Sequence, residues 1–330
     1  MAEAVSAHAV RVQAHGGPEV LSFDTVEVAA PAAGQVRLRQ TAIGLNFIDT
    51  YFRTGLYPAP GSFPFIPGSE GVGIVEAVGE GVTNVQVGDR VGYGDAMGSY
   101  AEIRLAPAAR LIPIPEGVSD TIAASVLLKG MTARYLLRET FKVGPGNTIL
   151  FHAAAGGVGQ IATQWAKALG ATVIGTVGSP EKAEIARRLG CDHVIDYRSE
   201  NFVDRVLEIT GGAKLDVVYD SVGKDTFPAS LDCLKRRGLW VSFGQSSGPV
   251  PPFNIGILNQ KGSLFATRPS LGGYISEPSE LAETAKDLFD VLASGKVVVG
   301  EPQTFRLADA TEAHRALEGR KTSGSVVLIP

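Results

Sequence analysis

Hydrophobic and polar positions follow two different periods along this chain, and the change falls near residue 121. From residue 9 to about residue 115, short stretches alternate at period two and are broken by Gly and Pro, which is typical of strands and turns. The clearest stretches are Gln35–Arg39, Gly71–Val78 and Gln86–Tyr93. Frequent glycines in the last two indicate bulges and bends. The first part of the chain is therefore predicted to be a compact, barrel-like β domain.

After residue 121 the apolar spacing becomes helical, first over Ile122–Leu128 and then over Met131–Leu137. From Asn147 onward, apolar runs that suit buried strands alternate with amphipathic helices. The predicted strands are Thr148–Ala153, Ala171–Val177, His193–Asp196, Leu215–Asp220, Leu239–Phe243 and Ser263–Thr267. This alternation predicts right-handed crossovers and a doubly wound parallel sheet, so the fold class is α/β. A last strand, Gly324–Ile329, is expected to pack back on the first domain.

Two helices in this second part carry recognisable ends. Apolar residues from Val158 to Leu169 recur at steps of three and four and form one stripe, which Gly170 ends as a left-handed cap. Ser179 and Pro180 start the next helix as its N-cap and first helical residue, and Gly190 closes it.

Composition narrows the class of protein. A chain of 330 residues is too long for a single hydrophobic core, so two domains are expected. Its content of 45% hydrophobic and 19% charged residues is ordinary for a globular protein. The net charge of −4 gives no basic surface for nucleic acid or anionic lipid. The first 20 residues lack the apolar core of a secretory signal, and no run is long enough to cross a bilayer. The two distant cysteines, Cys191 and Cys233, are expected to be buried free thiols, which fits a reducing, cytoplasmic setting.

The strongest chemical signal is a glycine-rich turn, Ala153–Gly159, between a predicted strand and the striped helix. Small residues allow the backbone to approach a pyrophosphate, and the N–H groups and dipole of the helix N-terminus hold an anion. A lone glycine triplet is weak evidence, because most such segments simply turn. Its place inside repeated strand–helix units favours dinucleotide binding.

The end of the second strand indicates which dinucleotide binds. An NAD site usually places a carboxylate there for the ribose hydroxyls, but Val177, Gly178 and Ser179 supply none. Lys182 follows one helical turn later, and Tyr197 comes after the third strand. A hydroxyl, an ammonium and a phenol suit a 2′-phosphate, so NADPH is the predicted cofactor. The alternative is that Ser179 only caps its helix and Lys182 is a solvated surface residue.

Five motifs together resemble a known family. They are Leu45–Tyr51 with Gly55–Pro58, Leu128–Thr132, Phe151–Gly159, Tyr219–Gly223 and Thr267–Ser270. From about Arg11 to Pro330, the chain resembles the NADPH:quinone oxidoreductases, the zeta-crystallin-like, zinc-free branch of the medium-chain dehydrogenase/reductase superfamily. The resemblance implies a GroES-like catalytic domain over residues 1–127, a Rossmann NADPH-binding domain over 128–267 and a return to the catalytic domain over 268–330. It also implies a homodimer joined through Rossmann sheet edges, with Ser263–Thr267 as the edge strand.

The resemblance also implies a set of site residues. Near the nicotinamide it places Asn46, Asp49, Thr132 and Tyr135, and at the pyrophosphate Gly156, Gly157 and Val158. At the adenosine ribose phosphate it places Gly178, Ser179, Lys182 and Tyr197, and along the rest of the cofactor Ser221, Val222, Phe243, Ser246, Arg268 and Arg320.

No zinc site is expected. Zinc-dependent relatives have a cysteine where Asn46 stands and a histidine where Ser69 stands in the triplet Gly68–Glu70. None of the five histidines has a partner at ligand spacing, and a structural zinc lobe would need four cysteines. Simple alcohol oxidation is therefore disfavoured, since it depends on a metal to hold the alkoxide.

Without a metal the acceptor must take hydride readily, and a quinone does so because its product is an aromatic hydroquinone anion. The candidate catalytic residues are Asn46, Tyr51, Tyr57 and Arg268, which would hold the nicotinamide and the acceptor face to face in a crevice between the domains. Both tyrosines have the alternative of packing beside Pro58 and Pro60. Two other functions stay open: reduction of the C=C bond of an enone or enal, and an NADPH-binding protein with a structural or RNA-contacting role.

Overall fold

A computed structural model describes residues 3–319, 321–322 and 324–330. The chain divides into two compact units. Unit 1 comprises Met1–Met131, Ile275–Phe289 and Val299–Pro330, and unit 2 comprises Thr132–Tyr274 and Asp290–Val298. Across the described ranges, no helix combines the length and the apolar character needed to cross a membrane.

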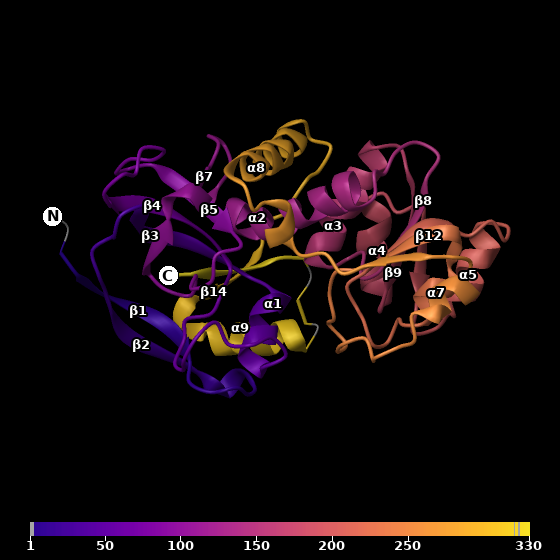
Figure 1. Ribbon diagram of the computed structural model, residues 1–330, viewed down its shortest axis with the longest axis horizontal. Coiled ribbons are helices and arrows are strands. Elements are labelled where there is room, and N and C mark those ends of the chain that lie inside the picture. The colour runs from indigo at the N-terminus through magenta and orange to yellow at the C-terminus, as the bar shows by residue number, and fades with distance from the viewer. Residues whose placement is uncertain (1–2, 320, 323) are drawn as a thin grey trace. The chain divides into compact units, whose positions relative to one another are not determined.

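Unit 1 is built on β-strands. Its main sheet has the order β14-β15-β3-β4-β5-β7, with β6 pairing β3, and a second sheet pairs β1 with β2. The strands are β1 (Val5–Val12), β2 (Leu21–Val28), β3 (Gln35–Leu45), β4 (Glu70–Val78), β5 (Arg90–Gly94), β6 (Ile103–Pro107), β7 (Ile112–Pro113), β14 (Gln303–Arg306) and β15 (Val326–Ile329). Irregular register between β3 and β4 confirms the predicted bulges. β15 pairs antiparallel with β3, so the C-terminal strand returns to the first sheet as predicted (Figure 1).

One strand prediction was wrong at its start. The stretch predicted from Gln86 forms a turn before β5, in which the Gln86 N–H donates to the Asp89 carboxylate at 2.9 Å and Gly88 takes a φ of +93°. Asp and Gly favour this local turn, and it overrides the alternating pattern. Unit 1 contains α1 (Phe47–Thr54), α9 (Ala310–Glu318) and short 3₁₀ turns at Pro18–Val20, Ala108–Arg110 and Leu307–Asp309, together with most of α2 (Asp120–Tyr135) and α8 (Pro278–Ala293).

Unit 2 holds a six-stranded, fully parallel sheet of order β10-β9-β8-β11-β12-β13. Its strands are β8 (Thr148–Phe151), β9 (Thr172–Val177), β10 (His193–Asp196), β11 (Leu215–Asp220), β12 (Leu234–Ser242) and β13 (Phe265–Thr267). When these six strands are numbered from 1 to 6 along the chain, their order in the sheet is 3-2-1-4-5-6, the order of a dinucleotide-binding fold. This order confirms the predicted doubly wound sheet. Figure 1 shows α4, α5 and α7 packed around β8, β9 and β12.

The ends predicted for α3 and α4 agree with the structure. From residue 120 to residue 293, the helical segments are α2 (Asp120–Tyr135), continued by a π-helical turn at Leu136–Thr140, α3 (Gly157–Ala168), α4 (Pro180–Arg188), α5 (Phe202–Ile209), α6 (Ala229–Asp232), α7 (Gly256–Gln260), a 3₁₀ turn at Leu271–Tyr274 and α8 (Pro278–Ala293). The Ser179 hydroxyl caps α4, and Gly170 has the left-handed φ of +89° expected after α3. Cys191 and Cys233 are buried free thiols, as predicted.

Candidate functional site

Most of the sequence-predicted cofactor residues lie at the carboxyl edge of the unit 2 sheet. Parallel strands end at one edge, which is where doubly wound sheets bind ligands. The residues that follow β8 to β13 at this edge are Gly156, Gly157, Val158, Gly178, Ser179, Lys182, Tyr197, Ser221, Val222, Phe243, Ser246 and Arg268. The parallel pairing thus brings them to one edge although almost the whole unit separates them in sequence. Arg320, predicted to join them, lies outside the described residues.

The turn after β8 has the form of a phosphate cradle. Gly156 is the N-cap of α3 and makes no side-chain cap bond, so no capping side chain competes for the N–H groups of the first turn. The backbone is tight here: a Cβ on Gly159 would lie 2.7 Å from the Ala154 carbonyl oxygen and closer still to that of Ala153. A side chain therefore does not fit at Gly159, in the first turn of α3, and the free N–H groups of such a helix start are suited to an anion.

A second polar group surrounds the end of β9. Ser179 accepts a hydrogen bond from the Lys182 N–H at 3.3 Å, and a Cβ on Gly178 would lie 2.8 Å from the Tyr197 ring. Sequence reasoning missed Glu181, whose exposed carboxylate accepts from the Ser179 hydroxyl, and this bond lowers the pKa of Glu181. The hydroxyl and phenol stand beside the helix N-terminus as predicted.

Asp220, at the end of β11, anchors the loop that carries Ser221 and Val222. Its Oδ1 accepts from the N–H groups of Val222 at 2.9 Å and Gly223 at 3.1 Å. Its Oδ2 accepts from Thr226 at 2.8 Å, Ser230 at 3.0 Å and the Trp240 indole at 3.2 Å. Burial raises the pKa of Asp220, but the hydrogen bonds from Thr226, Gly223 and Val222 act in the opposite direction, and the pKa is lowered overall.

The network continues from Asp220 to the phosphate turn. Because Ser230 donates to Asp220, it accepts from His152 Nε2 at 3.0 Å, and His152 Nδ1 then accepts from the Thr176 hydroxyl at 2.9 Å. Burial lowers the pKa of His152, which agrees with this neutral tautomer. Buried polar groups therefore link β8, β9 and β11 directly behind the loops that would hold a cofactor.

Arg268 and its surroundings form a groove of about 580 Å³ at the end of β12 and β13. The Arg268 guanidinium donates to the Ser242 carbonyl oxygen at 2.9 Å. The other lining residues are Trp240, Gln245, Pro249, Val250, Pro251, Pro252, Phe253, Ala266 and Thr267. Thr132 and Tyr135 lie near the end of α2, where the Tyr135 ring stacks on Tyr274 with centroids 4.4 Å apart.

In unit 1, Asn46 and Asp49 begin α1. Asn46 is the N-cap, and its backbone N–H donates to Asp49 Oδ2 at 2.9 Å. The Asn46 amide donates to Glu70 Oε2 at 2.9 Å, and the Lys129 ammonium donates to the same oxygen at 3.2 Å. Sequence reasoning missed both Glu70 and Lys129 as site residues. These two charged side chains, 59 positions apart, form a buried ion pair directly beside Asn46.

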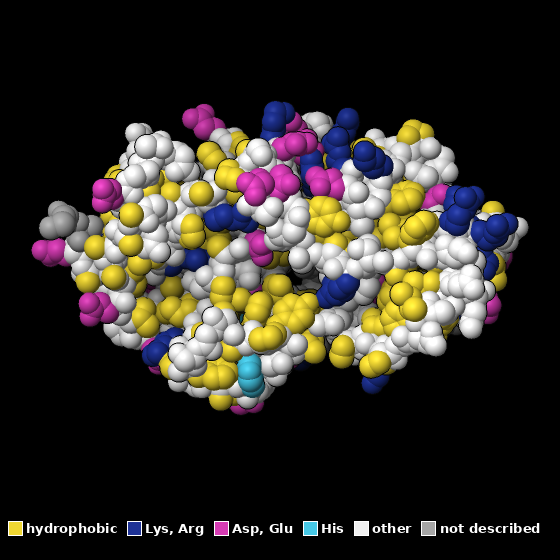
Figure 2. Space-filling view, viewed as in Figure 1, with side chains coloured by type: hydrophobic (Ala, Val, Ile, Leu, Met, Phe, Trp, Pro, Cys, Tyr) yellow, Lys and Arg dark blue, Asp and Glu magenta, His cyan; other side chains and the backbone are white. Residues whose placement is uncertain are grey.

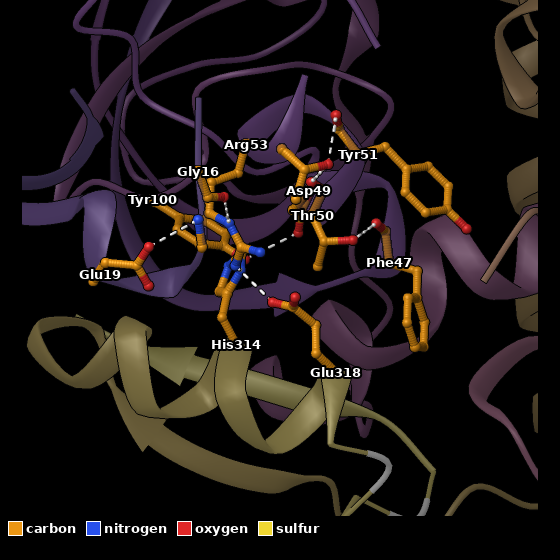
Figure 3. A network of polar contacts seen from close by, with 12 residues as sticks. Gly16, Glu19, Phe47, Asp49, Thr50, Tyr51, Arg53, Tyr100, His314 and Glu318 are labelled. Carbon is orange, nitrogen blue, oxygen red and sulfur yellow. Dashed lines mark hydrogen bonds and ion pairs between the residues drawn. The ribbon is translucent and has the colours of Figure 1, made fainter. Parts of the chain in front are cut away.

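Asp49 ends a chain of hydrogen bonds that runs through Arg53, His314 and Tyr100, all labelled in Figure 3. Arg53 can only donate, so His314 Nδ1 accepts from it at 2.8 Å, and His314 Nε2 donates to the Tyr100 hydroxyl at 3.1 Å. Tyr100 in turn donates to Asp49 Oδ2 at 3.0 Å, while Asp49 Oδ1 is buried without a partner among the described residues.

Burial sets the protonation of this chain. It raises the pKa of Asp49 to about 7, although the bonds from Asn46 and Tyr100 oppose the rise. It lowers the pKa of His314 to about 3, helped by the charge of Arg53, so His314 is neutral. Arg53 also pairs with Glu318 at 2.7 Å. The C-terminal helix α9 thereby fixes α1 and the Asp49 carboxyl.

Tyr51 and Tyr57 pack against each other, with ring centroids 5.3 Å apart and an edge-on angle of 64°. In Figure 3 the Tyr51 side chain points away from the Arg53 network. Both the predicted catalytic role and the packing alternative are compatible with this arrangement.

No group of three or more His, Cys, Asp or Glu side chains within the described ranges could hold a metal ion. At the position where zinc-dependent relatives have a histidine, the chain has Ser69, buried next to Glu70.

Comparisons with known proteins agree with this geometry. The family "Alcohol dehydrogenase GroES-like domain" matches residues 32–116, and "Zinc-binding dehydrogenase" matches residues 157–289. A quinone oxidoreductase of Pseudomonas aeruginosa is 54% identical over 97% of this chain and 99% of its own length. The chain belongs to the quinone oxidoreductase family. It combines a GroES-like domain with a Rossmann domain, as predicted from its motifs.

Two further relatives extend the match. The crystal structure of an Escherichia coli quinone oxidoreductase complexed with NADPH superposes with a TM-score of 0.95 at 52% identity, covering 98% of this chain and all of that one. A 2-haloacrylate reductase of a Burkholderia species is 49% identical over 96% of both chains. The uncapped helix α3, the tight Gly159 and the Ser179–Tyr197 group fit a dinucleotide with an added phosphate. The chain is an oxidoreductase.

Proposed function

We propose that the chain catalyses the NADPH-dependent reduction of quinones by hydride transfer, without a metal. The observation that carries the proposal is the pair of anion sites at one edge of the unit 2 sheet, the N-terminus of α3 and the Ser179 group, in a chain whose relatives are quinone oxidoreductases. When bound, the dihydronicotinamide supplies the hydride. The protein binds and orients both reactants and excludes water.

The proposed roles follow the positions of the residues. Gly156, Gly157 and Val158 bind the pyrophosphate, and Gly178, Ser179, Lys182 and Tyr197 bind the 2′-phosphate. Asn46, Asp49, Thr132 and Tyr135 orient the nicotinamide. Ser221, Val222, Phe243, Ser246, Arg268 and Arg320 hold the rest of the cofactor. Tyr51, Tyr57, Asn46 and Arg268 contact the acceptor. In this scheme the domains are residues 1–127, 128–267 and 268–330.

The first test compares NADPH with NADH across benzoquinone, naphthoquinone and a simple enone. We expect Lys182→Ala to raise the KM for NADPH by roughly 10-fold and leave that for NADH unchanged, because only NADPH carries the phosphate that this ammonium would contact. Lys142→Ala, at an exposed lysine, is the control. Equal use of both nucleotides by the unaltered protein would contradict the cofactor assignment.

A second test concerns the proton. A hydroquinone anion is stabilised by its aromatic ring, so water can protonate it and no obligatory acid is needed. We expect Tyr51→Phe to lower turnover about 2- to 5-fold, through loss of one hydrogen bond. Complete loss of turnover in a variant that still binds NADPH would identify Tyr51 as an obligatory acid.

Reduction of an activated C=C bond is the second candidate. Its support is the 49% identity to a protein named 2-haloacrylate reductase. Both reactions deliver hydride to a conjugated system, so the acceptor panel separates them. An enone turned over faster than every quinone would reverse the order of the two proposals.

The third candidate, an RNA-contacting role, is tested by filter binding at low salt, where we expect no retention because the net charge is −4.

We also propose a homodimer joined through β13, in a cytoplasmic protein. Unit 2 leaves β13 at the edge of its sheet, and Phe265 in β13 and Ile255 at the start of α7 are 60% and 76% exposed. Hydrophobic side chains gather on the surface over α7 in Figure 2. Sedimentation should give a dimer that Phe265→Glu converts to a monomer, whereas Val298→Glu, at a similarly exposed residue, leaves it intact. A monomeric unaltered protein would contradict the proposal.

A further inference from the structure

The buried ion pair between Lys129 and Glu70 in unit 1 has unequal partners. Glu70 is fully buried, and both of its carboxylate oxygens are occupied: Oε1 accepts from the Leu128 N–H at 2.7 Å, and Oε2 accepts from Asn46 and Lys129. Lys129 carries three N–H donors. Within the described part of the chain, the structure gives its ammonium one hydrogen bond, at 3.2 Å. Two donors of a side chain that is only 7% exposed are therefore not used by Glu70.

The surroundings of Lys129 hold its ammonium group in one place. Its ammonium shares one carboxylate oxygen with the Asn46 amide, so these two groups stand side by side at the start of α1. Glu70 holds the amide nitrogen of Asn46 and orients both side chains. The neighbouring carboxyl, Asp49, feels the charge of Lys129 as well. A cation held in this way is preorganised for an anionic oxygen, and the small exposed fraction of the pair lies on Lys129, since that of Glu70 is zero.

We propose that Lys129 is a further catalytic residue, whose ammonium donates a hydrogen bond to the carbonyl oxygen of the acceptor and stabilises the negative charge that this oxygen gains. The inference rests on the proposed function. In the reaction the acceptor takes up one hydrogen with two electrons as hydride, and NADPH becomes NADP⁺. The charge appears on the acceptor's oxygen, and a proton from water completes the hydroquinone or, for an enone, the ketone. Lys129 keeps its own protons throughout.

The competing explanation is that Lys129 only neutralises Glu70. Removing the charge of Lys129 distinguishes the two explanations. A cation that stabilises the anionic product increases the rate most for acceptors that take electrons poorly. We expect Lys129→Met to lower kcat/KM about 100-fold for an enone or a weak quinone, and clearly less for benzoquinone. The Kd for NADPH should stay within twofold, and Lys142→Met should behave as the unaltered protein. An equal loss with every acceptor would overturn the proposal.

A binding measurement tests the same charge without turnover. The probe is 2-hydroxy-1,4-naphthoquinone, whose anion is coloured, titrated into the protein loaded with NADP⁺. We expect the bound probe to be ionised over a wider pH range than in water, and Lys129→Met to raise its Kd at pH 7 on the order of 10-fold. The same spectrum and Kd in a folded Lys129→Met variant would overturn the proposal.

Lys129→Met leaves Glu70 without its cation and can unfold the chain. The double variant Glu70→Gln/Lys129→Met removes both charges together and replaces the single variant in that case. If neutralisation of Glu70 were the whole role of Lys129, the double variant would keep the acceptor dependence and the probe spectrum of the unaltered protein. If the unaltered protein reduces no quinone or enone, the proposed function fails. If it still binds the probe as an anion, with an affinity that depends on Lys129, the assignment of Lys129 as an anion-binding residue is kept.

Discussion

Gly159→Val should raise the Kd for NADPH roughly 100-fold, equivalent to about 2.8 kcal/mol. The reason is the backbone of the turn after β8. A Cβ at Gly159 would lie 2.7 Å from the Ala154 carbonyl oxygen and 2.8 Å from its carbon, and real Cβ atoms do not approach backbone so closely. The turn must open to admit the side chain, and the N–H groups at the start of α3 then lose their common direction.

Fluorescence titration with NADPH measures this effect, and circular dichroism checks that the variant is folded. Gly144→Ala is the matched control, because a Cβ there meets no atom within 4 Å and its φ lies outside the left-handed region. A Gly159→Val protein that binds NADPH within twofold of the unaltered affinity would show that the pyrophosphate does not depend on this turn.

Local sequence signals predicted local structure well. Ser179 followed by Pro180 located the start of α4, and the apolar stripe ended at Gly170 located the end of α3. These signals work because a cap or a left-handed residue acts on its own turn. At Gln86–Asp89 the alternating pattern predicts a strand, but Gly88 and Asp89 form a local turn, which is the stronger signal.

The polar networks of the site could not be predicted in this way. His314 meets Tyr100 and Arg53 across 214 and 261 positions, and Lys129 meets Glu70 across 59. Nothing in the neighbourhood of a buried histidine or lysine indicates its partner, because the partner is determined by how the sheet brings strands together. Motif resemblance located the residues expected to touch the cofactor, but it missed the residues that hold them.

Asp220 is the clearest of these supporting residues, and Asp220→Ala should lower the free energy of unfolding by roughly 3–5 kcal/mol, since several buried donors each lose their acceptor at about 1–3 kcal/mol. Asp220→Asn should be nearly as damaging. Hydroxyl donors can rotate away from an introduced NH₂ group, but Oδ1 faces the fixed N–H groups of Val222 and Gly223, and Oδ2 faces the fixed indole N–H of Trp240. In either orientation of the asparagine amide, its NH₂ group therefore faces a fixed N–H donor and cannot accept its hydrogen bond.

Urea unfolding measures the loss, and Asp225→Ala, which removes an exposed carboxylate from the same loop, is the control expected to change stability by less than about 0.5 kcal/mol. The pH dependence follows from the lowered pKa of Asp220. A carboxyl whose pKa is lower in the folded protein stabilises it above the unfolded value, near 4, and this contribution disappears as the pH falls through the folded value. The difference between the unaltered protein and Asp220→Asn should thus be constant from pH 6 to 8 and shrink below about pH 4. A difference that grew on acidification would mean that Asp220 is protonated in the folded protein, and that its network holds the cofactor loop without a charge.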